Sequence, residues 1–392
     1  MSQTHDDILL KVENLRQYFK VRGGNAIRAV DDISFDIKRG EVFGLVGESG
    51  CGKTTTGRTI IGLYEPTGGR VWFQGKCVAD GRNGQNYVKR QEARRTAQTI
   101  QQLKTIRDEL SLAEPDNREA LHQTYNAQIA AEETALKAFQ AEYGKAYLDR
   151  GQCDRRNADM TRMQMIFQDP IASINPRMTV QEIIAEGLIV QGVKDKEFIR
   201  GKVLEVLDKV GLVPEHADRY PHEFSGGQRQ RIGIARASIM EPELIIADEP
   251  ISALDVSIQA QIINLLNELR QSLGLTILFI AHNLSVVKYF SDRIAVMYYG
   301  RIVEMADTEE LFRYPMHPYT ISLLSAIPYP DPHFEKQRKR ITYSPAHEHN
   351  YTFDKPRFAE IRPGHFVLCN QAEEAAHRER LGQNARPGAA PT

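Results

Sequence analysis

The 392-residue chain has little of three things: cysteine, net charge and long apolar segments. Its four cysteines, Cys51, Cys77, Cys153 and Cys369, are scattered, so they predict neither a disulfide framework nor a metal cluster. The formal net charge of −1 argues against bulk nucleic-acid binding, which usually needs a basic surface. No apolar run approaches the roughly 20 residues that cross a bilayer. Residues 1–7 are polar and unlike a secretion signal, so we expect a cytosolic, soluble protein.

A glycine-rich segment lies between a predicted strand, residues 42–46, and a predicted helix, residues 56–63. Its sequence is Gly47-Glu48-Ser49-Gly50-Cys51-Gly52-Lys53-Thr54-Thr55. In the spacing G-x-x-x-x-G-K-T, backbone N–H groups surround phosphate oxygens and the helix N-terminus favours their negative charge. We expect Lys53 to reach the β- and γ-phosphates and the Thr54 hydroxyl to bind Mg²⁺. The alternative is a glycine-rich turn with a chance lysine.

Two further apolar strands are predicted to end in polar groups. Residues 244–247 lead into Asp248 and Glu249, and residues 276–281 lead into His282. Continuous apolar runs indicate parallel strands covered on both faces, and α/β sheets bind ligands at the carboxyl ends of strands. We expect Asp248 to hold Mg²⁺, Glu249 to polarise an attacking water and His282 to contact the γ-phosphate. Taken singly, the histidine could be a core residue and the acid pair a helix cap.

The remaining predicted elements place three more candidates. Between the first strands, 9–12 and 29–37, lie Tyr18 and Phe19, either of which could stack on adenine or pack into the core. A strand at 163–168 ends in Gln168, and a helical region follows at about 180–213. Another helix opens with Ser225-Gly226-Gly227-Gln228.

Residues 80–156 differ from their surroundings and are rich in Ala, Gln, Glu, Lys and Arg. Apolar residues recur at helical spacing on both sides of a break at residues 114–117, which predicts two antiparallel helices with a thin apolar seam. The hypotheses are a solvated insertion or a docking arm for a partner. We favour the solvated insertion, because nothing in it carries chemistry.

In this order, the motifs resemble the ATP-binding subunits of ABC transporters over roughly residues 8–330, apart from the helical insertion. The matching segments, in the family's terms, are the Walker A loop (47–55), the Q-loop glutamine (Gln168), the signature (225–228), the Walker B strand with its glutamate (244–249), the D-loop (252–255) and the switch histidine (His282). Phe19, in preference to Tyr18, falls where the family has its adenine-stacking aromatic ring. The resemblance implies an α/β P-loop ATPase with a mostly parallel core sheet, an antiparallel β subdomain, a helical subdomain and the inserted hairpin.

The same resemblance implies the site and its cofactors, ATP and Mg²⁺. Catalytic roles fall to Glu249, His282 and Gln168, and Mg²⁺ ligation to Thr54, Gln168 and Asp248. Nucleotide contacts fall to Phe19, residues 47–55, the signature residues 225–228 and Asp255. The signature completes the site of a second cassette, so that ATP is sandwiched between two cassettes. The expected divisions are 1–79 (core with β subdomain), 80–156 (insertion), 157–235 (Q-loop and helical subdomain), 236–310 (rest of the core) and 311–392 (tail).

Several segments are similar to one branch of the family, the oligopeptide and dipeptide importers. They are 167–170, 173–180, 255–261, His317-Pro318-Tyr319-Thr320 and 323–328. The implied partners are a second ATPase subunit, as a heterodimer in preference to a homodimer, two transmembrane permease subunits and, indirectly, an extracytoplasmic solute-binding protein. No nucleic acid is expected. We expect a peripheral protein on the cytoplasmic face of the cell membrane. The alternatives are an importer of nickel or another small solute, an exporter cassette, a non-hydrolysing cassette and a non-transport ABC ATPase.

The chain departs from the family in three places. Asn283 replaces the usual aspartate after the switch histidine, which predicts retuned hydrolysis. Of the tail cysteines that hold an iron–sulfur cluster in many relatives only Cys369 remains, so no cluster is expected. The tail histidines His347, His349 and His365 could bind a metal, but without a ligand spacing pattern we expect mobile, solvated side chains.

Overall fold

A computed structural model describes residues 7–23, 25–143, 145, 153, 160–252, 254–327 and 340–384. Its centre is an eight-stranded sheet in the order β11-β12-β10-β9-β3-β8-β7-β6. Neighbours from β9 to β6 pair in parallel, and neighbours from β9 to β11 pair antiparallel. The strands are β3 (Val42–Val46), β6 (Met163–Ile166), β7 (Leu244–Asp248), β8 (Thr276–Ala281), β9 (Arg293–Tyr298), β10 (Arg301–Asp307), β11 (Arg357–Arg362) and β12 (His365–Cys369).

The three strands predicted to carry site residues lie side by side at the middle of this sheet. Every residue of β3, β7 and β8 is buried, as their continuous apolar runs predicted. Alternate side chains point to opposite faces. Leu278 and Ile280 of β8 therefore contact one core, and Ile277 and Phe279 the other. The parallel register brings the carboxyl ends of the three strands to one edge.

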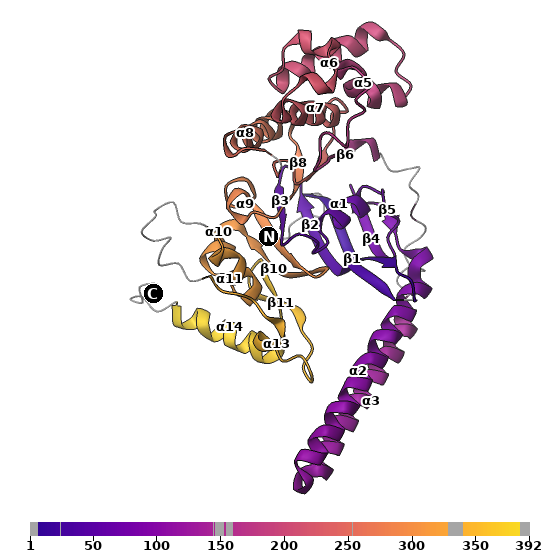
Figure 1. Cartoon of the computed structure of the whole chain (residues 1–392), viewed down its shortest axis with the longest axis vertical. Helices are drawn as coiled ribbons and strands as arrows, with labels where there is room; N and C mark the ends of the chain where they lie inside the picture. Colours follow the sequence, from indigo (N-terminus) through magenta and orange to yellow (C-terminus); the bar gives the residue numbers. More distant parts are fainter. Residues whose placement is uncertain are drawn as a thin grey trace.

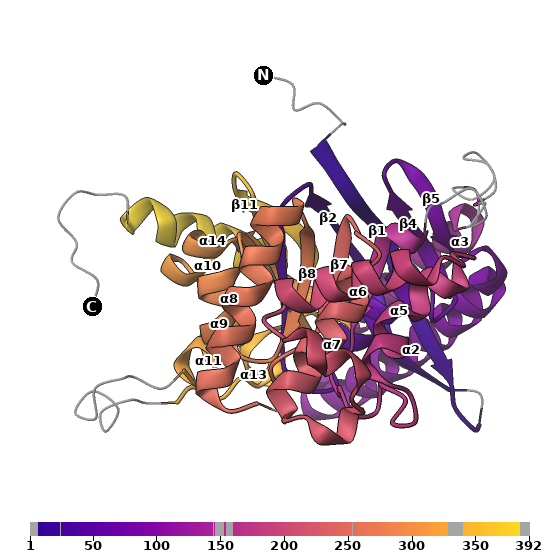
Figure 2. The ribbon, with the colours of Figure 1, turned by 90° about the horizontal axis from the view of Figure 1, so that it is seen from above.

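An antiparallel sheet covers one face of the core sheet. Its order is β2-β1-β4-β5, and it packs with α1 over the apolar side chains of one face of β3, β7 and β8. The opposite face is covered by α8 and α9, so the core strands lie between the two layers (Figure 2). The bounds are β1 (Ile8–Lys20), β2 (Ala26–Lys38), β4 (Gly68–Phe73), β5 (Lys76–Asp80), α1 (Lys53–Ile60), α8 (Val256–Leu273) and α9 (Leu284–Phe290).

The predicted helical subdomain forms a separate lobe above the sheet (Figure 1). It consists of α5 (Val180–Val190), α6 (Lys196–Lys209) and α7 (Gly226–Ser238). Thr179 and Glu182 form a capping box at the start of α5, and the Asp195 carboxylate caps α6. Within the described residues, no helix is both long enough and apolar enough to span a membrane.

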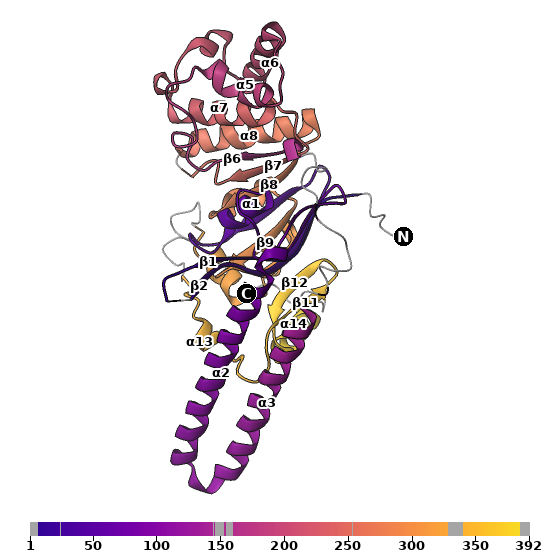
Figure 3. The same cartoon turned by 90° about the vertical axis from the view of Figure 1, so that its right-hand side faces the viewer.

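The insertion is the helical hairpin that the sequence predicted. Two antiparallel helices, α2 (Gln85–Ala113) and α3 (Arg118–Glu142), project from the β subdomain as an arm (Figure 3). Their seam is thin: Leu103, Tyr125 and Ile129 are buried between them. The two helices therefore share few apolar contacts, and most of their other side chains are polar.

One face of the arm packs on the C-terminal tail, so it is not solvated all round. The Tyr125 ring lies 5.4 Å from the Phe353 ring, and Gln128 donates a hydrogen bond to the Thr352 carbonyl. The buried carboxylate of Glu132 accepts from the Lys355 ammonium at 2.5 Å. The insertion and a segment more than 200 residues later therefore share an interface.

The cysteine prediction was wrong for one pair. Cys77 on β5 forms a disulfide with Cys153, and their Cα atoms are 5.0 Å apart. The cysteines are 76 residues apart in sequence, and the antiparallel helices between them return the chain to its starting point. Cys51 and Cys369 are free and buried.

We expect alkylation of the denatured chain to count these thiols. Without reductant, iodoacetamide should add two groups, at Cys51 and Cys369, because the other two sulfur atoms are bonded to each other. After reduction it should add four. Intact-mass and peptide mass spectrometry measure both numbers. Four adducts without reductant would show that Cys77 and Cys153 are thiols.

The tail extends the core sheet, because β12 pairs with β10 across the expected division at residue 310. Its helices are α10 (Thr308–Arg313), α11 (Pro318–Ser325), α13 (Pro345–Glu348) and α14 (Gln371–Asn384). The expectation of solvated tail histidines was wrong for two of three. His365 is fully buried with Nε2 2.9 Å from Glu304, and His349 lies with Nδ1 2.6 Å from Glu373. Each imidazole ring has a carboxylate partner that is distant in the sequence and close only in the folded chain. His347 is exposed.

Candidate phosphate-binding and hydrolytic site

The glycine-rich loop joins β3 to α1 and folds around the Lys53 ammonium. Lys53 Nζ donates to the carbonyls of Gly47, at 2.8 Å, and Glu48, at 2.9 Å, and its side chain is 3% exposed. Ser49 and Gly50 are exposed at the top of the loop, whereas Cys51 is buried beneath it. Burial raises the pKa of the Cys51 thiol, so this cysteine is a packing residue.

Two glycines of the loop are required by close backbone approach. A Cβ at Gly52, where φ is +112°, would lie 2.0 Å from the Ala29 carbonyl oxygen. A Cβ at Gly47 would lie 2.2 Å from the Met297 carbonyl oxygen. The loop is therefore held against β2 and β9, and its exposed backbone and the N-terminus of α1 face outward. That arrangement suits a phosphate chain.

Thr54 and Asp248 meet at the carboxyl ends of β3 and β7, as predicted. The Thr54 hydroxyl donates to Asp248 Oδ1 at 2.8 Å. The other carboxylate oxygen, Oδ2, is buried and has no hydrogen-bond partner within the described part of the chain. Burial raises the pKa of Asp248 against the lowering effect of the Thr54 hydrogen bond. Two hard oxygen donors with one unpaired buried oxygen fit a Mg²⁺ ion, which would hold Asp248 ionised.

Glu249 lies at the centre of the remaining catalytic candidates. Its Oε2 accepts from Gln168 Nε2 at 3.2 Å and lies 3.1 Å from His282 Nδ1, while Oε1 is 3.9 Å from Lys53 Nζ. Glu249 has a positive φ of 45°, unusual for a residue with a side chain, and its N–H donates to the Ile280 carbonyl. The structure thus joins Gln168, Glu249 and His282 beside the loop. A small pocket, lined also by Ser252 and Gln259, opens next to the glutamate and the histidine.

Asn283, where the chain departs from the family pattern, has a structural role as a helix cap. Its Oδ1 accepts the Ser285 N–H and so caps α9. Asparagine and aspartate cap helices about equally well, so the substitution keeps the helix start and removes a charge.

The signature residues form the start of α7, which belongs to the helical lobe (Figure 1). Ser225 caps α7 and forms a capping box with Gln228, and Ser225 and Gly226 are exposed. Gly227 lets α7 pack closely on α8, since a Cβ there would lie 2.7 Å from Ile258 Cγ2. Asp255 is exposed at the start of α8. Among the residues described, no hydrogen bond or ion pair joins residues 225–228 or Asp255 to residues 47–55.

The structure distinguishes the two aromatic candidates. Tyr18 is buried, and its hydroxyl donates to Asp31 at 2.5 Å, so this ring is committed to the interior. Phe19 is half-buried, and its ring makes an edge contact with Tyr64 at 5.4 Å. Phe19 thus stays the candidate for stacking.

One contact at the site was not predicted from the sequence. The Tyr319 hydroxyl accepts a hydrogen bond from the Glu48 N–H of the loop at 3.0 Å. Tyr319 belongs to the segment His317-Pro318-Tyr319-Thr320, which in the sequence indicated only a branch of the family.

Comparisons with known proteins identify the family. Residues 30–155 and 134–252 match the ABC transporter family, and residues 303–360 match the C-terminal region of oligopeptide/dipeptide transporters. The chain is 48% identical to the oligopeptide transport ATP-binding protein OppF of Bacillus subtilis (strain 168), over 93% of this chain and 97% of that one. It is 42% identical to the dipeptide transport ATP-binding protein DppF of Lactococcus lactis subsp. cremoris (strain MG1363), over 95% and 97%.

Solved structures share the fold. One is cbiO1 of Clostridium perfringens, with a TM-score of 0.52 and 24% identity over 78% of this chain and 91% of that one. Another is a dimeric ATP-binding cassette in a post-hydrolysis state with ADP and phosphate, with a TM-score of 0.52 and 24% identity over 76% and 99%. The chain therefore belongs to the ABC transporter family and is one of its ATPases.

Proposed function

We propose that this chain is the ATP-hydrolysing subunit of an importer of oligopeptides or dipeptides. The observation that carries the proposal is that the cluster of Gln168, Glu249 and His282 occurs in a chain whose C-terminal region matches oligopeptide/dipeptide transporters. The names of the relatives support it, since they are oligopeptide and dipeptide transport proteins.

Each site residue has a role in this proposal. Residues 47–55 hold the phosphates, with Lys53 supplying the positive charge, and Phe19 stacks on the adenine. Thr54 and Asp248 bind Mg²⁺, with Gln168 as a further ligand; the ion would neutralise charge on the phosphates. Glu249 accepts a proton from the attacking water, and His282, 3.1 Å away, orients this carboxylate and contacts the γ-phosphate.

The separation of the signature from the loop supports a two-cassette site. Ser225 and Asp255 are exposed. Within the described part of the chain, neither is joined to residues 47–55 by a hydrogen bond or an ion pair. In the proposal they contact ATP bound to a second, non-identical cassette, and that cassette's signature contacts ATP bound here. ATP then favours the closed pair, and hydrolysis removes this preference. The cassettes lie at the cytoplasmic face of the membrane, and their closure is transmitted through the segment after Gln168 to two permease subunits. The permease subunits then open outward, toward a solute-binding protein outside the membrane.

Affinity purification from the native membrane tests the assignment. A tagged chain extracted in mild detergent should bring two permease subunits and a second cassette, and peptides should stimulate its ATPase activity. Stimulation by nickel or another small solute instead would replace the cargo class. Recovery without membrane partners would overturn the transport assignment and leave the ATPase chemistry in place.

A further inference from the structure

Tyr319 connects the C-terminal tail to the phosphate loop. Its hydroxyl accepts from the Glu48 N–H at 3.0 Å, and the Glu48 carbonyl in turn accepts from Lys53 Nζ at 2.9 Å. The same residue of the loop is thus held from the tail on one side and receives the ammonium on the other. Tyr319 is 2% exposed, and burial raises the pKa of its phenol, so the hydroxyl stays protonated.

The start of α11 fixes the position of Tyr319. His317 precedes the helix, and its Nδ1 accepts the Tyr319 N–H at 3.1 Å. Burial lowers the pKa of His317 to about 3, with a further contribution from His349, so this ring is neutral and keeps the lone pair that accepts. The fully buried carboxylate of Glu304, on β10, accepts from the N–H groups of Met316, at 2.8 Å, and His317, at 3.0 Å.

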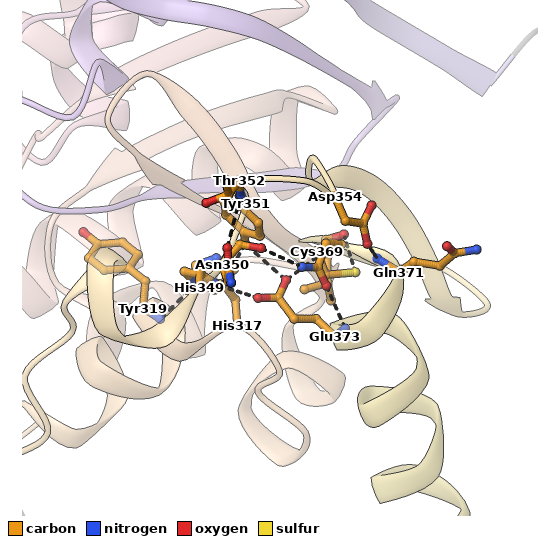
Figure 4. A network of polar contacts seen from close by, with 12 residues as sticks. His317, Tyr319, His349, Asn350, Tyr351, Thr352, Asp354, Cys369, Gln371 and Glu373 are labelled. Carbon is orange, nitrogen blue, oxygen red and sulfur yellow. Dashed lines mark hydrogen bonds and ion pairs between the residues drawn. The ribbon is translucent and has the colours of Figure 1, made fainter. Parts of the chain in front are cut away.

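Aromatic rings from separate segments surround this helix start. The Tyr319 ring lies 4.4 Å from the Tyr298 ring and 5.6 Å from the Tyr343 ring. The His317 ring lies 5.1 Å from the His349 ring. In Figure 4, Glu373 of α14 points toward His349 and Tyr351, and its carboxylate is 2.6 Å from His349 Nδ1. The Tyr319 ring is thus packed between a ring of β9 and a ring of the tail, with its hydroxyl at the loop.

We propose that Tyr319 is a positioning residue for ATP, whose hydroxyl holds the start of the phosphate loop in its nucleotide-binding form. The tail contributes to ATP affinity through this one hydrogen bond. The inference goes beyond the importer assignment, because it concerns nucleotide binding by this chain alone and holds for any cargo.

Tyr319→Phe removes the hydroxyl and keeps the ring. ATP affinity of the full-length chain should fall about fivefold, the loss expected when one hydrogen bond is removed. The KM for ATP should rise by the same factor, with kcat changed less than twofold. Competition of unlabelled ATP against a fluorescent ATP analogue measures the affinity. Tyr343→Phe is the matched control, because it removes a hydroxyl from the same ring cluster and should leave ATP affinity unchanged.

A purely structural role predicts a different pattern. It would lower the melting temperature and the active fraction, and hence the apparent kcat, at unchanged KM. Equal ATP affinities for the two variants would overturn the proposal. Hydrogen exchange of the wild-type chain gives a test that is independent of variant folding: the Glu48 amide should be protected without nucleotide. Exchange of that amide at the rate of an unfolded peptide would also overturn it.

Discussion

Replacing Glu249 with glutamine should lower the turnover of ATP about 100- to 10,000-fold, the range associated with loss of a general base. Glutamine has the shape of glutamate but cannot take a proton from water. The Gln168 and His282 side chains, at 3.2 and 3.1 Å from Oε2, still find a polar partner, so the site should keep its shape. ATP affinity should change less than threefold. Phosphate release and equilibrium nucleotide binding measure the two quantities on one preparation.

The matched control for this variant is Glu268→Gln. Glu268 is exposed on α8, so the same chemical change there should leave turnover unaltered. If Glu249→Gln hydrolysed ATP as fast as wild type, the catalytic carboxylate would have to be another residue.

Replacing Lys53 with methionine should abolish tight ATP binding. The Lys53 side chain is 3% exposed, and the loop surrounds its ammonium group. Methionine fills the space of the apolar stem but has no ammonium group. Truncating a buried, hydrogen-bonded charged group at an interface typically costs about 2–5 kcal/mol. That range corresponds to roughly 30-fold or more in affinity. The measurement is the ATP-induced rise in melting temperature, which should be present in wild type and absent in the variant.

Lys209→Met gives the comparison for lost charge alone. Lys209 pairs with Glu205 on one face of α6, and its side chain is 34% exposed. This variant should show the wild-type rise in melting temperature with ATP. An affinity for Lys53→Met within threefold of wild type would exclude Lys53 from phosphate binding.

The site elements that the sequence predicted are those whose signal is local. The spacing from Gly47 to Thr55 describes a loop without reference to the rest of the chain. Three apolar runs that lead into the phosphate loop, Asp248 and His282 required only one rule, that parallel strands align their carboxyl ends. The helical insertion was predictable for the same reason, because helix periodicity is a property of a short window.

Contacts between distant segments gave no such signal. His365 is buried because Glu304, 61 residues away, lies on the adjacent strand. Without knowledge of that partner, a polar histidine is expected at the surface. The Cys77–Cys153 disulfide forms only because the two helices of the insertion bring residue 153 back beside residue 77. Tyr319 and Glu48 are 271 residues apart, and only the packing of the tail against the core brings them together.

The contact between the arm and the tail limits which segments of this chain can be exchanged with those of another cassette. Glu132 of α3 is 4% exposed and has its counter-charge, Lys355, on the tail. Transplanting the arm alone into another cassette would remove the cation that pairs with this carboxylate and would uncover the face of α3 on which the tail packs. It would also separate Tyr125 from Phe353. The arm and the tail segment that contains Phe353 and Lys355 therefore form one exchangeable unit, although the whole helical lobe lies between them in the sequence.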